Sequence, residues 1–344
     1  MFSMRLVSNP PNPFAHHSLE WDGPVPPAEL QLFEENARSV LSRNDSPDIG
    51  FEYSLNPYRG CFHACAYCYA RPTHQYLDFG AGTDFDRKIV VKVNAPERLR
   101  EAFRKPSWAG RPLVFSGNTD PYQPIEAHYE LTKRCLEVCA EYKNPVYIIT
   151  KSKLVRRDAA LLGRLARETD ARVAVSIPFA DDDDARLLEP FASPPSKRFE
   201  TLRVLRDAGV PTTVSLAPTI PGLNDAQIPE ILERAREAGA DKAFMTLVRL
   251  AAEVRPVFEQ RLREAFPQRA DKVLRRVGEM RSGQRGGFHE RMRGEGEHYQ
   301  LVEQLFRKTA LRLGYDLQRG PEPLGPSPFA RPIEPRRQLT LFEG

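Results

Sequence analysis

The sequence predicts an α/β protein that is built as a partial (β/α)6 barrel and followed by a helical C-terminal appendage. Apolar, strand-like runs alternate with amphipathic, helix-like segments between residues 113 and 248. The strand pattern stops near residue 250, and only helical periodicity continues beyond it. Alternating strands and helices favour a parallel sheet with crossover helices, and about six such units are expected to curl into a partial barrel.

The expected elements follow in order along the chain. Short strands are expected at 51–55 and 87–94, with a mixed polar stretch between them. The alternating part is expected to contain strands at 113–116, 146–150, 172–178, 210–217 and 241–248, and helices at 126–142, 154–168, 196–208 and 226–238. Further helices are expected at 253–266, 269–280 and 299–313. Polar motifs lie where the strands end, which is where barrels of this kind build their sites.

Composition indicates how the chain is divided. It has 344 residues, of which 41% are hydrophobic and 28% charged, as is typical of a soluble globular protein. We expect four regions: a proline-rich N-terminal arm at 1–50, the barrel at 51–250, a basic helical appendage at 251–319, and a flexible proline-rich tail at 320–344.

Charge and hydropathy restrict the environment of the protein. The net charge of +4 is too small to indicate a nucleic-acid partner by itself. No apolar run approaches the length needed to cross a membrane, and the N-terminus lacks the apolar segment of a secretory leader. We therefore expect a cytoplasmic location and no membrane partner, and a reducing compartment also suits thiolate ligands.

Three of the five cysteines lie in one short stretch, residues 56–69, which reads N-P-Y-R-G-C-F-H-A-C-A-Y-C-Y. Cys61, Cys65 and Cys68 have the spacing C-x3-C-x2-C. Three such close thiols pair badly as disulfides, but as thiolates they can hold one soft metal centre. Three ligands fit an iron-sulfur cube in which one iron lacks a protein ligand, whereas closed structural sites normally use four.

A structural zinc site with His63 or His74 as the fourth ligand is the alternative. Zinc ligands usually occur as two separated pairs, unlike this single group. A histidine inside the loop, such as His63, more plausibly faces solvent or hydrogen-bonds a cluster sulfur. Optical and EPR spectra after anaerobic reconstitution distinguish the two, because a colourless protein with one zinc contradicts a cluster.

The cysteine spacing, with Tyr67 directly before the last cysteine, resembles the signature of the radical S-adenosylmethionine superfamily. The resemblance implies a barrel of the radical SAM type and a [4Fe-4S] cluster on Cys61, Cys65 and Cys68, with Tyr67 beside the cofactor. It also implies that the free iron chelates S-adenosylmethionine, and that an external electron donor supplies the electron for its cleavage. The product is a 5′-deoxyadenosyl radical that abstracts hydrogen from a substrate.

The segment after the strand at 113–116 reads S-G-N-T-D-P-Y-Q-P and is rich in small, hydrogen-bonding residues. Glycine lets backbone groups approach a ligand closely, and the polar side chains supply acceptors suited to an ammonium group. By resemblance, Ser116, Gly117, Asn118 and Asp120 hold the amino group of S-adenosylmethionine. An ordinary turn is the alternative interpretation of the same residues.

Later strand ends supply further candidates. Ser176 is suited to hydrogen-bond a ribose hydroxyl, and Lys197 with Arg198 to pair with the methionyl carboxylate. The turn P-G at 221–222 is suited to bring backbone against adenine. Solvated side chains at loop edges are the alternative in each case. The tyrosines near the site serve as radical relays, substrate stackers or packing residues; they are Tyr58, Tyr67, Tyr69 and Tyr122.

The cysteine loop, the segment T-D-P-Y-Q-P-I-E at 119–126 and the turn P-G-L-N-D at 221–225 together resemble the spore photoproduct lyase-related branch. By analogy this implies DNA-repair-type chemistry. The lyase uses an additional cysteine as hydrogen donor, and this chain has none between Cys68 and Cys135, which puts photoproduct reversal in doubt. Cys135 and Cys139 lie on one helix face and are expected to pack, whereas an auxiliary cluster would need more ligands.

Two segments suggest macromolecular partners. Residues 275–293 mix arginine, glycine and Phe288, a composition suited to DNA phosphates and bases but equally to a solvated helix face and loop. The stretch from Gln338 to Phe342, Q-L-T-L-F, resembles the peptide by which bacterial repair proteins dock into the sliding clamp, unless it docks on the chain's own surface. The rival function is a non-catalytic, metal-stabilised nucleic-acid binding module, which would produce no 5′-deoxyadenosine.

Overall fold

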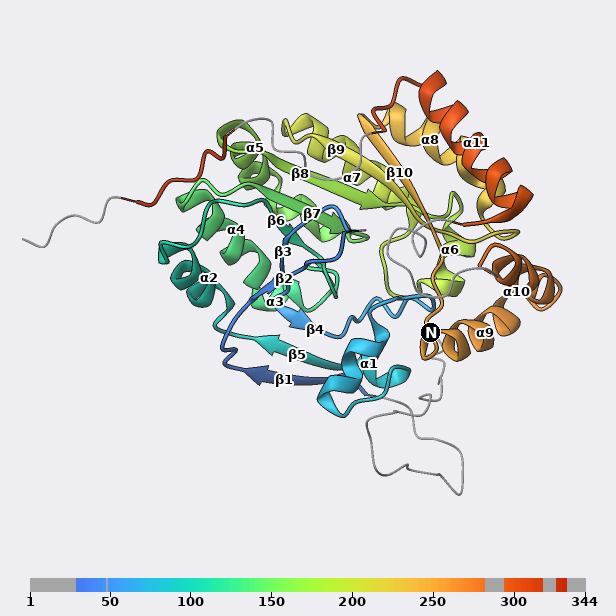
Figure 1. Ribbon diagram of the computed structural model, residues 1–344, viewed down its shortest axis with the longest axis horizontal. Helices are drawn as coiled ribbons and strands as arrows, with labels where there is room; N and C mark the ends of the chain where they lie inside the picture. Colours follow the sequence, from blue (N-terminus) through green and yellow to red (C-terminus); the bar gives the residue numbers. More distant parts are fainter. Residues whose placement is uncertain (1–28, 48, 282–293, 318–325, 333–344) are drawn as a thin grey trace, which may run out of the picture.

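The computed structural model describes residues 29–47, 49–281, 294–317 and 326–332. Within these residues the strands form a seven-stranded sheet and a three-stranded sheet (Figure 1). The strand order of the large sheet is β10-β9-β8-β7-β6-β3-β2. Its members are β2 (Leu41–Arg43), β3 (Tyr53–Leu55), β6 (Leu113–Phe115), β7 (Val146–Thr150), β8 (Ala171–Ser176), β9 (Thr212–Thr219) and β10 (Lys242–Leu247).

Six consecutive strands of this sheet, from β3 to β10, are parallel to their neighbours. The strands are apolar and mostly buried; β6, with sequence L-V-F, is buried at every position. Strand β2 pairs antiparallel with β3 and closes one edge. The predicted partial (β/α)6 barrel is therefore confirmed.

The three-stranded sheet lies below the large one in Figure 1. Its order is β1 (Gln31–Glu35), β5 (Lys88–Lys92) and β4 (Tyr58–Arg59), with β5 parallel to β1 and antiparallel to β4. The strand expected at 87–94 is thus present but belongs to this separate sheet. Residues 29–47, which the prediction included in the N-terminal arm, contain β1 and β2, because their pairing partners lie later in the chain.

A layer of helices covers the outer face of the large sheet. Each packs against the next: α2 on α4, α4 on α5, α5 on α7, α7 on α8, and α8 on α11. Leucines such as Leu162, Leu202 and Leu232 are fully buried between this layer and the sheet. The helices of the layer are α2 (Ala95–Arg104), α4 (Leu131–Glu141), α5 (Ala159–Glu168), α7 (Pro195–Asp207), α8 (Ile228–Glu237) and α11 (Gly296–Arg312).

Two helices differ from their predicted form. The helix expected at 126–142 is divided at Glu130, whose φ of 50° is left-handed and cannot continue an α-helix. The helix expected at 154–168 begins with a tighter 3₁₀ turn. The shorter elements are η1 (Arg71–Leu77), α1 (Thr83–Arg87), α3 (Glu126–Tyr129), η2 (Lys153–Asp158), α6 (Asp182–Leu188) and η3 (Asp225–Gln227).

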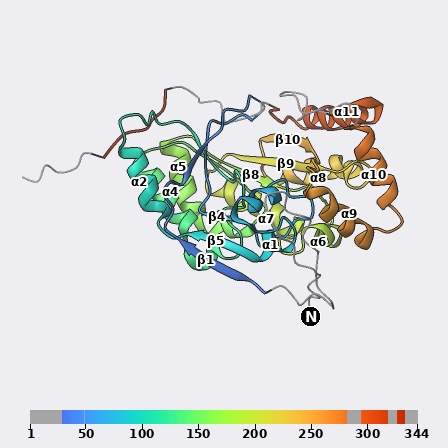
Figure 2. The same cartoon turned by 60° about the horizontal axis from the view of Figure 1, so that its bottom comes forward.

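The C-terminal appendage has two parts. Helices α9 (Val254–Ala265) and α10 (Ala270–Glu279) lie near α6 at one end of the sheet in both views (Figures 1 and 2). Phe258 and Leu262 of α9 belong to the same buried cluster as Cys65 and Tyr67 of the cysteine loop. Helix α11 instead returns to the barrel and packs on α8. The first part of the appendage therefore covers the predicted site.

The segment 326–332, predicted to belong to a mobile tail, is bound to the barrel. The Ser327 hydroxyl donates to the Gly110 carbonyl at 2.6 Å, and Ala330 N donates to Tyr142 O at 2.9 Å. The guanidinium of Arg331 donates to carbonyls at the end of α2. Residues 333–344, with the clamp-like segment from Gln338 to Phe342, lie outside the described residues. None of the described helices combines the length and apolar character needed to cross a bilayer.

Candidate metal centre and cofactor site

The three clustered cysteines lie beside the C-terminal ends of the parallel strands. Cys61 and Cys65 are 7% and 8% exposed, and Cys68 is partly exposed. Burial raises the pKa of all three thiols, to about 12 for Cys65. After burial and Asp120, the other two thiols raise the pKa of Cys61 further, so the three sulfurs lie close enough to interact. The raised pKa values favour protonated thiols. Metal cations would favour the deprotonated form instead, because they bind thiolates.

A cluster fits this arrangement better than a single metal ion. Among the residues that the structure describes, no three His, Cys, Asp or Glu side chains converge on one ion. In an iron-sulfur cube each thiolate binds a different iron, so the three sulfurs do not need to converge on one point. Three free thiols from one loop, two buried and one partly exposed, therefore match the donor set of such a cube.

Both histidines proposed as a fourth zinc ligand have other partners. His74 Nε2 lies 2.7 Å from the Lys88 carbonyl, and its ring packs edge-on against Phe85. His63 Nδ1 lies 3.4 Å from Asp120 Oδ2. Within the described part of the chain neither histidine joins the cysteines in a group that could hold one metal ion.

The start of the cysteine loop is held by backbone contacts. The Gly60 carbonyl accepts from the Thr119 hydroxyl at 2.7 Å, and Cys61 N donates to Phe85 O at 3.0 Å. Gly60 has a φ of 79°, and a Cβ there would lie 2.8 Å from the His74 ring. Only glycine fits this conformation and this space, so the loop can enter the site at this point.

The segment 116–120 lies against the cysteine loop, as predicted. Asn118 N donates to Asn56 Oδ1 at 3.0 Å, and the Tyr69 hydroxyl donates to the Gly117 carbonyl at 2.9 Å. Ser116 has a φ of 112°, a strained value of the kind that is found at ligand-binding sites. A Cβ at Gly117 would lie 2.8 Å from the Ser54 hydroxyl, so this close approach requires glycine.

Asp120 joins the loops that follow β6 and β7. Its Oδ1 accepts from the Thr150 hydroxyl and its Oδ2 from Lys151 N, both at 2.7 Å. Burial opposes its ionisation, but His63 and these hydrogen bonds outweigh burial and hold the pKa of Asp120 below its ordinary value. The carboxylate is thus ionised and already bound within the protein. Its contact with an ammonium group stays a prediction.

The structure brings one of the two later candidates to the site and leaves the other outside. Ser176 is buried at the end of β8, where its carbonyl accepts from Arg198 Nη1 at 2.9 Å. Lys197 lies on the exposed face of α7, and its Nζ pairs with Glu200 at 2.9 Å. The helix therefore directs Arg198, and not Lys197, toward the strand ends.

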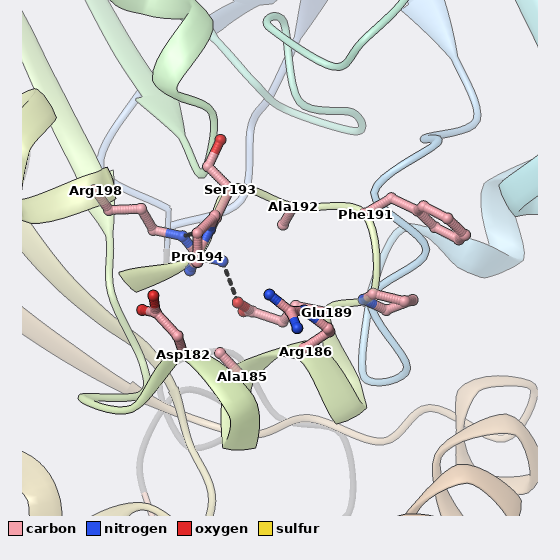
Figure 3. A pocket seen from close by; sticks show the side chains of 10 residues that line it. Asp182, Ala185, Arg186, Glu189, Phe191, Ala192, Ser193, Pro194 and Arg198 are labelled. Carbon is pink, nitrogen blue, oxygen red and sulfur yellow. Dashed lines mark hydrogen bonds and ion pairs between the residues drawn. The ribbon is translucent and has the colours of Figure 1, made fainter. Parts of the chain in front are cut away.

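Glu189 and Arg198 form a buried ion pair that sequence reasoning did not identify (Figure 3). The Tyr67 hydroxyl donates to the same carboxylate, and the Lys151 ammonium lies 5.6 Å from the centre of the Tyr67 ring. Burial raises the pKa of Glu189, and Arg198 opposes that rise. A cavity next to the pair is lined also by Phe191. The network fixes the orientation of the aromatic ring inside the cysteine motif.

Comparison with known proteins identifies the family. A family model described as "Radical SAM superfamily" matches residues 55–235. The chain belongs to this superfamily. The "Uncharacterized protein Rv2578c" of Mycobacterium tuberculosis is 38% identical over 242 residues, covering 70% of this chain and 71% of the relative. The "Radical SAM Nalpha-GlyT isomerase" of Pseudomonas phage M6 is 27% identical over 273 residues, covering 77% of this chain and 54% of that protein.

Solved structures of spore photoproduct lyase share the fold. Spore photoproduct lyase complexed with dinucleoside spore photoproduct has a TM-score of 0.58 at 17% identity, and the match covers 84% of this chain and 82% of that chain. A mutant of the lyase with bound AdoMet and dinucleoside spore photoproduct has a TM-score of 0.57. At this identity the likeness concerns the fold. The shared fold agrees with the resemblance of the sequence motifs to the spore photoproduct lyase-related branch.

Membership of the superfamily implies a [4Fe-4S] cluster and S-adenosylmethionine. The donor set agrees with this, because three thiols of one loop leave one corner of a cube without a protein ligand. The segment with Ser116 and Gly117 lies directly beside these thiols. A radical SAM site can therefore be assembled from the cysteine loop and the ends of β6, β7 and β8.

The remaining tyrosines and cysteines have structural partners. Tyr58 and Tyr122 are fully buried, and their hydroxyls donate to the carboxylates of Glu126 and Asp158. Cys135 and Cys139 are free thiols with no exposed surface, and both belong to the main apolar core. The expectation that these two cysteines serve packing is confirmed.

Proposed function

We propose that this protein generates a 5′-deoxyadenosyl radical and uses it to abstract hydrogen from a nucleic-acid or nucleoside substrate. The observation that carries the proposal is the position of Cys61, Cys65 and Cys68. They are three free thiols of one buried loop, next to the segment 116–120 and the ends of parallel strands. The cofactors, when bound, supply the reductive cleavage of a carbon-sulfur bond and the radical that results.

The residues of this chain bind the cofactors, orient them and exclude water from the site. The three cysteines would hold the cluster, and a cube with three protein ligands would have one iron available to bind S-adenosylmethionine. Gly117 lets backbone approach the ligand, and Ser116 and Asn118 offer hydrogen-bonding groups to its amino end. Ser176, at the end of β8, offers a hydrogen bond to the ribose of S-adenosylmethionine. The ion pair of Glu189 with Arg198 keeps Tyr67 in place through its hydroxyl.

Nucleic acid is the substrate class that the relatives favour. The lyase that shares the fold binds a dinucleoside photoproduct, and this chain carries the motifs that resemble its branch. Reversal of the photoproduct itself is not proposed, because the chain has no cysteine between Cys68 and Cys135 to donate hydrogen. The activity proposed is radical chemistry on a different nucleoside.

The partner predictions remain proposals. In the described part of residues 275–293, Arg275 already pairs with Glu279 at 3.7 Å, and residues 282–293 lie outside the described residues. DNA binding by this segment predicts salt-dependent retention on DNA at low ionic strength. Docking on the sliding clamp predicts that a fluorescent peptide of residues 331–344 binds clamp, and that the same peptide with Leu341 and Phe342 replaced by alanine does not.

One experiment tests the proposed function. The anaerobically reconstituted protein is reduced in the presence of S-adenosylmethionine and deuterated mononucleosides, dinucleotides or short DNA. We expect 5′-deoxyadenosine to form, and deuterium to enter it from one of these substrates. A reconstituted protein that holds its cluster but forms no 5′-deoxyadenosine would support the non-catalytic binding module instead.

A further inference from the structure

Two buried arginines hold the backbone of the cysteine loop from behind. Arg71 donates through Nε and Nη2 to the Cys65 carbonyl, at 3.2 and 2.8 Å. Arg261 donates through Nη1 to the Ala64 carbonyl. Two consecutive carbonyls of the loop are thus bound by guanidinium groups. Because Ala64 has a left-handed φ of 56°, these contacts hold the loop where its backbone is unusual.

One carboxylate joins the two arginines. Asp86 Oδ1 lies 2.8 Å from Arg71 Nη2, and its Oδ2 lies 2.9 Å from Arg261 Nη2. The side chains of Arg71, Asp86 and Arg261 are 0%, 3% and 9% exposed. They come from η1, from α1 and from α9 of the C-terminal appendage. Two positive groups and one negative group leave one net positive charge buried behind the loop.

The positive charge lies directly behind the backbone of the ligand loop, because the two guanidinium groups donate to the carbonyls of Cys65 and Ala64. The Nε of Arg261 is buried and has no hydrogen-bond partner among the described residues, so one donor of this guanidinium is unused. The other two nitrogens of the guanidinium bind the Ala64 carbonyl and Asp86.

We infer that Arg71, Asp86 and Arg261 form a clamp that positions the cysteine loop for the iron-sulfur cluster, and that the C-terminal appendage is part of the cluster site through Arg261. The inference rests on the proposed cluster. Buried ion triads often contribute little net stability compared with apolar packing, so a triad at this position is better explained by what it orients. Groups that orient metal ligands typically change metal affinity by about 10- to 100-fold when they are removed.

The test compares two arginines of the same helix. Arg261→Gln removes both the positive charge and the guanidinium group that binds Ala64 and Asp86. Arg261→Lys restores the charge but not the paired hydrogen bonds. Arg263→Gln is the control, because Arg263 is exposed and, among the residues that the structure describes, pairs with Asp271 on the surface of the appendage. Each protein is reconstituted anaerobically, and three quantities are measured: the rate of iron loss to a chelator, the EPR spectrum of the reduced cluster, and the melting temperature with and without the cluster.

We expect Arg261→Gln to lose iron about tenfold faster than the wild type and to show an altered EPR signal, whereas Arg261→Lys recovers part of the retention and Arg263→Gln matches the wild type. The melting temperature should fall more in the cluster-bound than in the cluster-free Arg261→Gln protein. An equal fall in both forms, or unchanged iron retention, overturns the clamp. A wild-type protein that itself takes up no cluster refutes the proposed function instead.

Discussion

Two groups of buried cysteines differ in their surroundings more than in their depth. Cys61 and Cys65 in the loop and Cys135 and Cys139 on α4 are all less than 9% exposed, and burial raises the pKa of each thiol. The loop thiols lie near one another and near cationic side chains such as Lys151. Burial is the cause of the raised pKa of Cys139, whereas the pKa of Cys135 is raised by burial and then by Cys139 and Glu126.

This difference shows what makes a cysteine a ligand. A thiol in an apolar core stays protonated and acts as a small hydrophobic group. A thiol in a loop that polar and charged groups hold from several sides can be deprotonated when a metal arrives. The surroundings that the fold creates thus agree with the separation of the two groups that the cysteine spacing along the chain predicts.

The largest effect should come from the loop. Cys65→Ala is expected to abolish the cluster and all formation of 5′-deoxyadenosine, because two thiolates cannot hold the cube in place. Iron and sulfide analysis and EPR after reconstitution measure this. Cys139→Ala is the control and should retain iron at the wild-type level. Equal iron content in the two variants would remove the distinction between the two cysteine groups.

The next effect concerns the ion pair that supports the loop. Glu189→Gln leaves Arg198 buried without a compensating charge, which is expected to cost about 3–5 kcal/mol of unfolding free energy. Urea denaturation of the cluster-free protein measures this cost. Glu233→Gln, at an exposed pair with Arg312, is the control and should leave the denaturation midpoint unchanged. A midpoint for Glu189→Gln that equals the control would show that the pair contributes nothing.

Lys92 on β5 is a buried cation outside the site, and its effect on the unfolding free energy can be measured. Burial and then Arg59 lower the pKa of Lys92 to about 8, while Glu35 opposes the change. Its proton is bound more tightly in the unfolded chain, so unfolding free energy should rise as the pH increases from about 8 to 10. Lys92→Met should remove this rise and stabilise the protein at pH 7 by roughly 3 kcal/mol.

Denaturation curves from pH 7 to pH 10 measure the slope, with Lys105→Met as a control on an exposed lysine. If the Lys92→Met protein keeps the wild-type slope, Lys92 is charged in the folded protein throughout this range. The interpretation of Lys92 as a buried cation that destabilises the fold would then be wrong.

A smaller effect is expected in the core. Cys139→Ser buries a hydroxyl among apolar side chains and should cost about 1–3 kcal/mol, whereas Cys139→Ala should cost about 1 kcal/mol. Thermal or urea denaturation measures both. Reconstituted iron should stay at the wild-type level in each variant. Loss of iron from Cys139→Ser without loss of stability would instead reveal a ligand on α4.

The smallest effect should be that of Lys197→Ala. Lys197 is half exposed and pairs with Glu200, so neither the melting temperature nor the binding of S-adenosylmethionine should change. Arg198→Met, one residue later, removes the ion pair with Glu189 that keeps Tyr67 in place. It should therefore weaken the binding of S-adenosylmethionine. Equilibrium dialysis with labelled S-adenosylmethionine compares the two variants. A weaker affinity in Lys197→Ala alone would restore the original assignment of the methionyl carboxylate to Lys197.

The sequence by itself determined the parallel barrel, the cysteine ligands and the segment 116–120. These features depend on local signals: strand and helix periods, and ligand spacing within one loop. The family comparison bears out the fold and the superfamily, while the ligand roles of the cysteines and of the segment 116–120 stay predictions.

Only the tertiary structure decided which charged side chains surround the cysteine loop. Glu189 and Arg261 lie 122 and 197 residues from the loop residues that they contact. Asp86 pairs with Arg261 across 175 residues, and no local pattern marks any of the three. The same holds for the choice of Arg198 over Lys197, because a rotation of about 100° per residue around a helix directs neighbours to different faces. Long-range packing sets such contacts, and a period or a spacing cannot encode them.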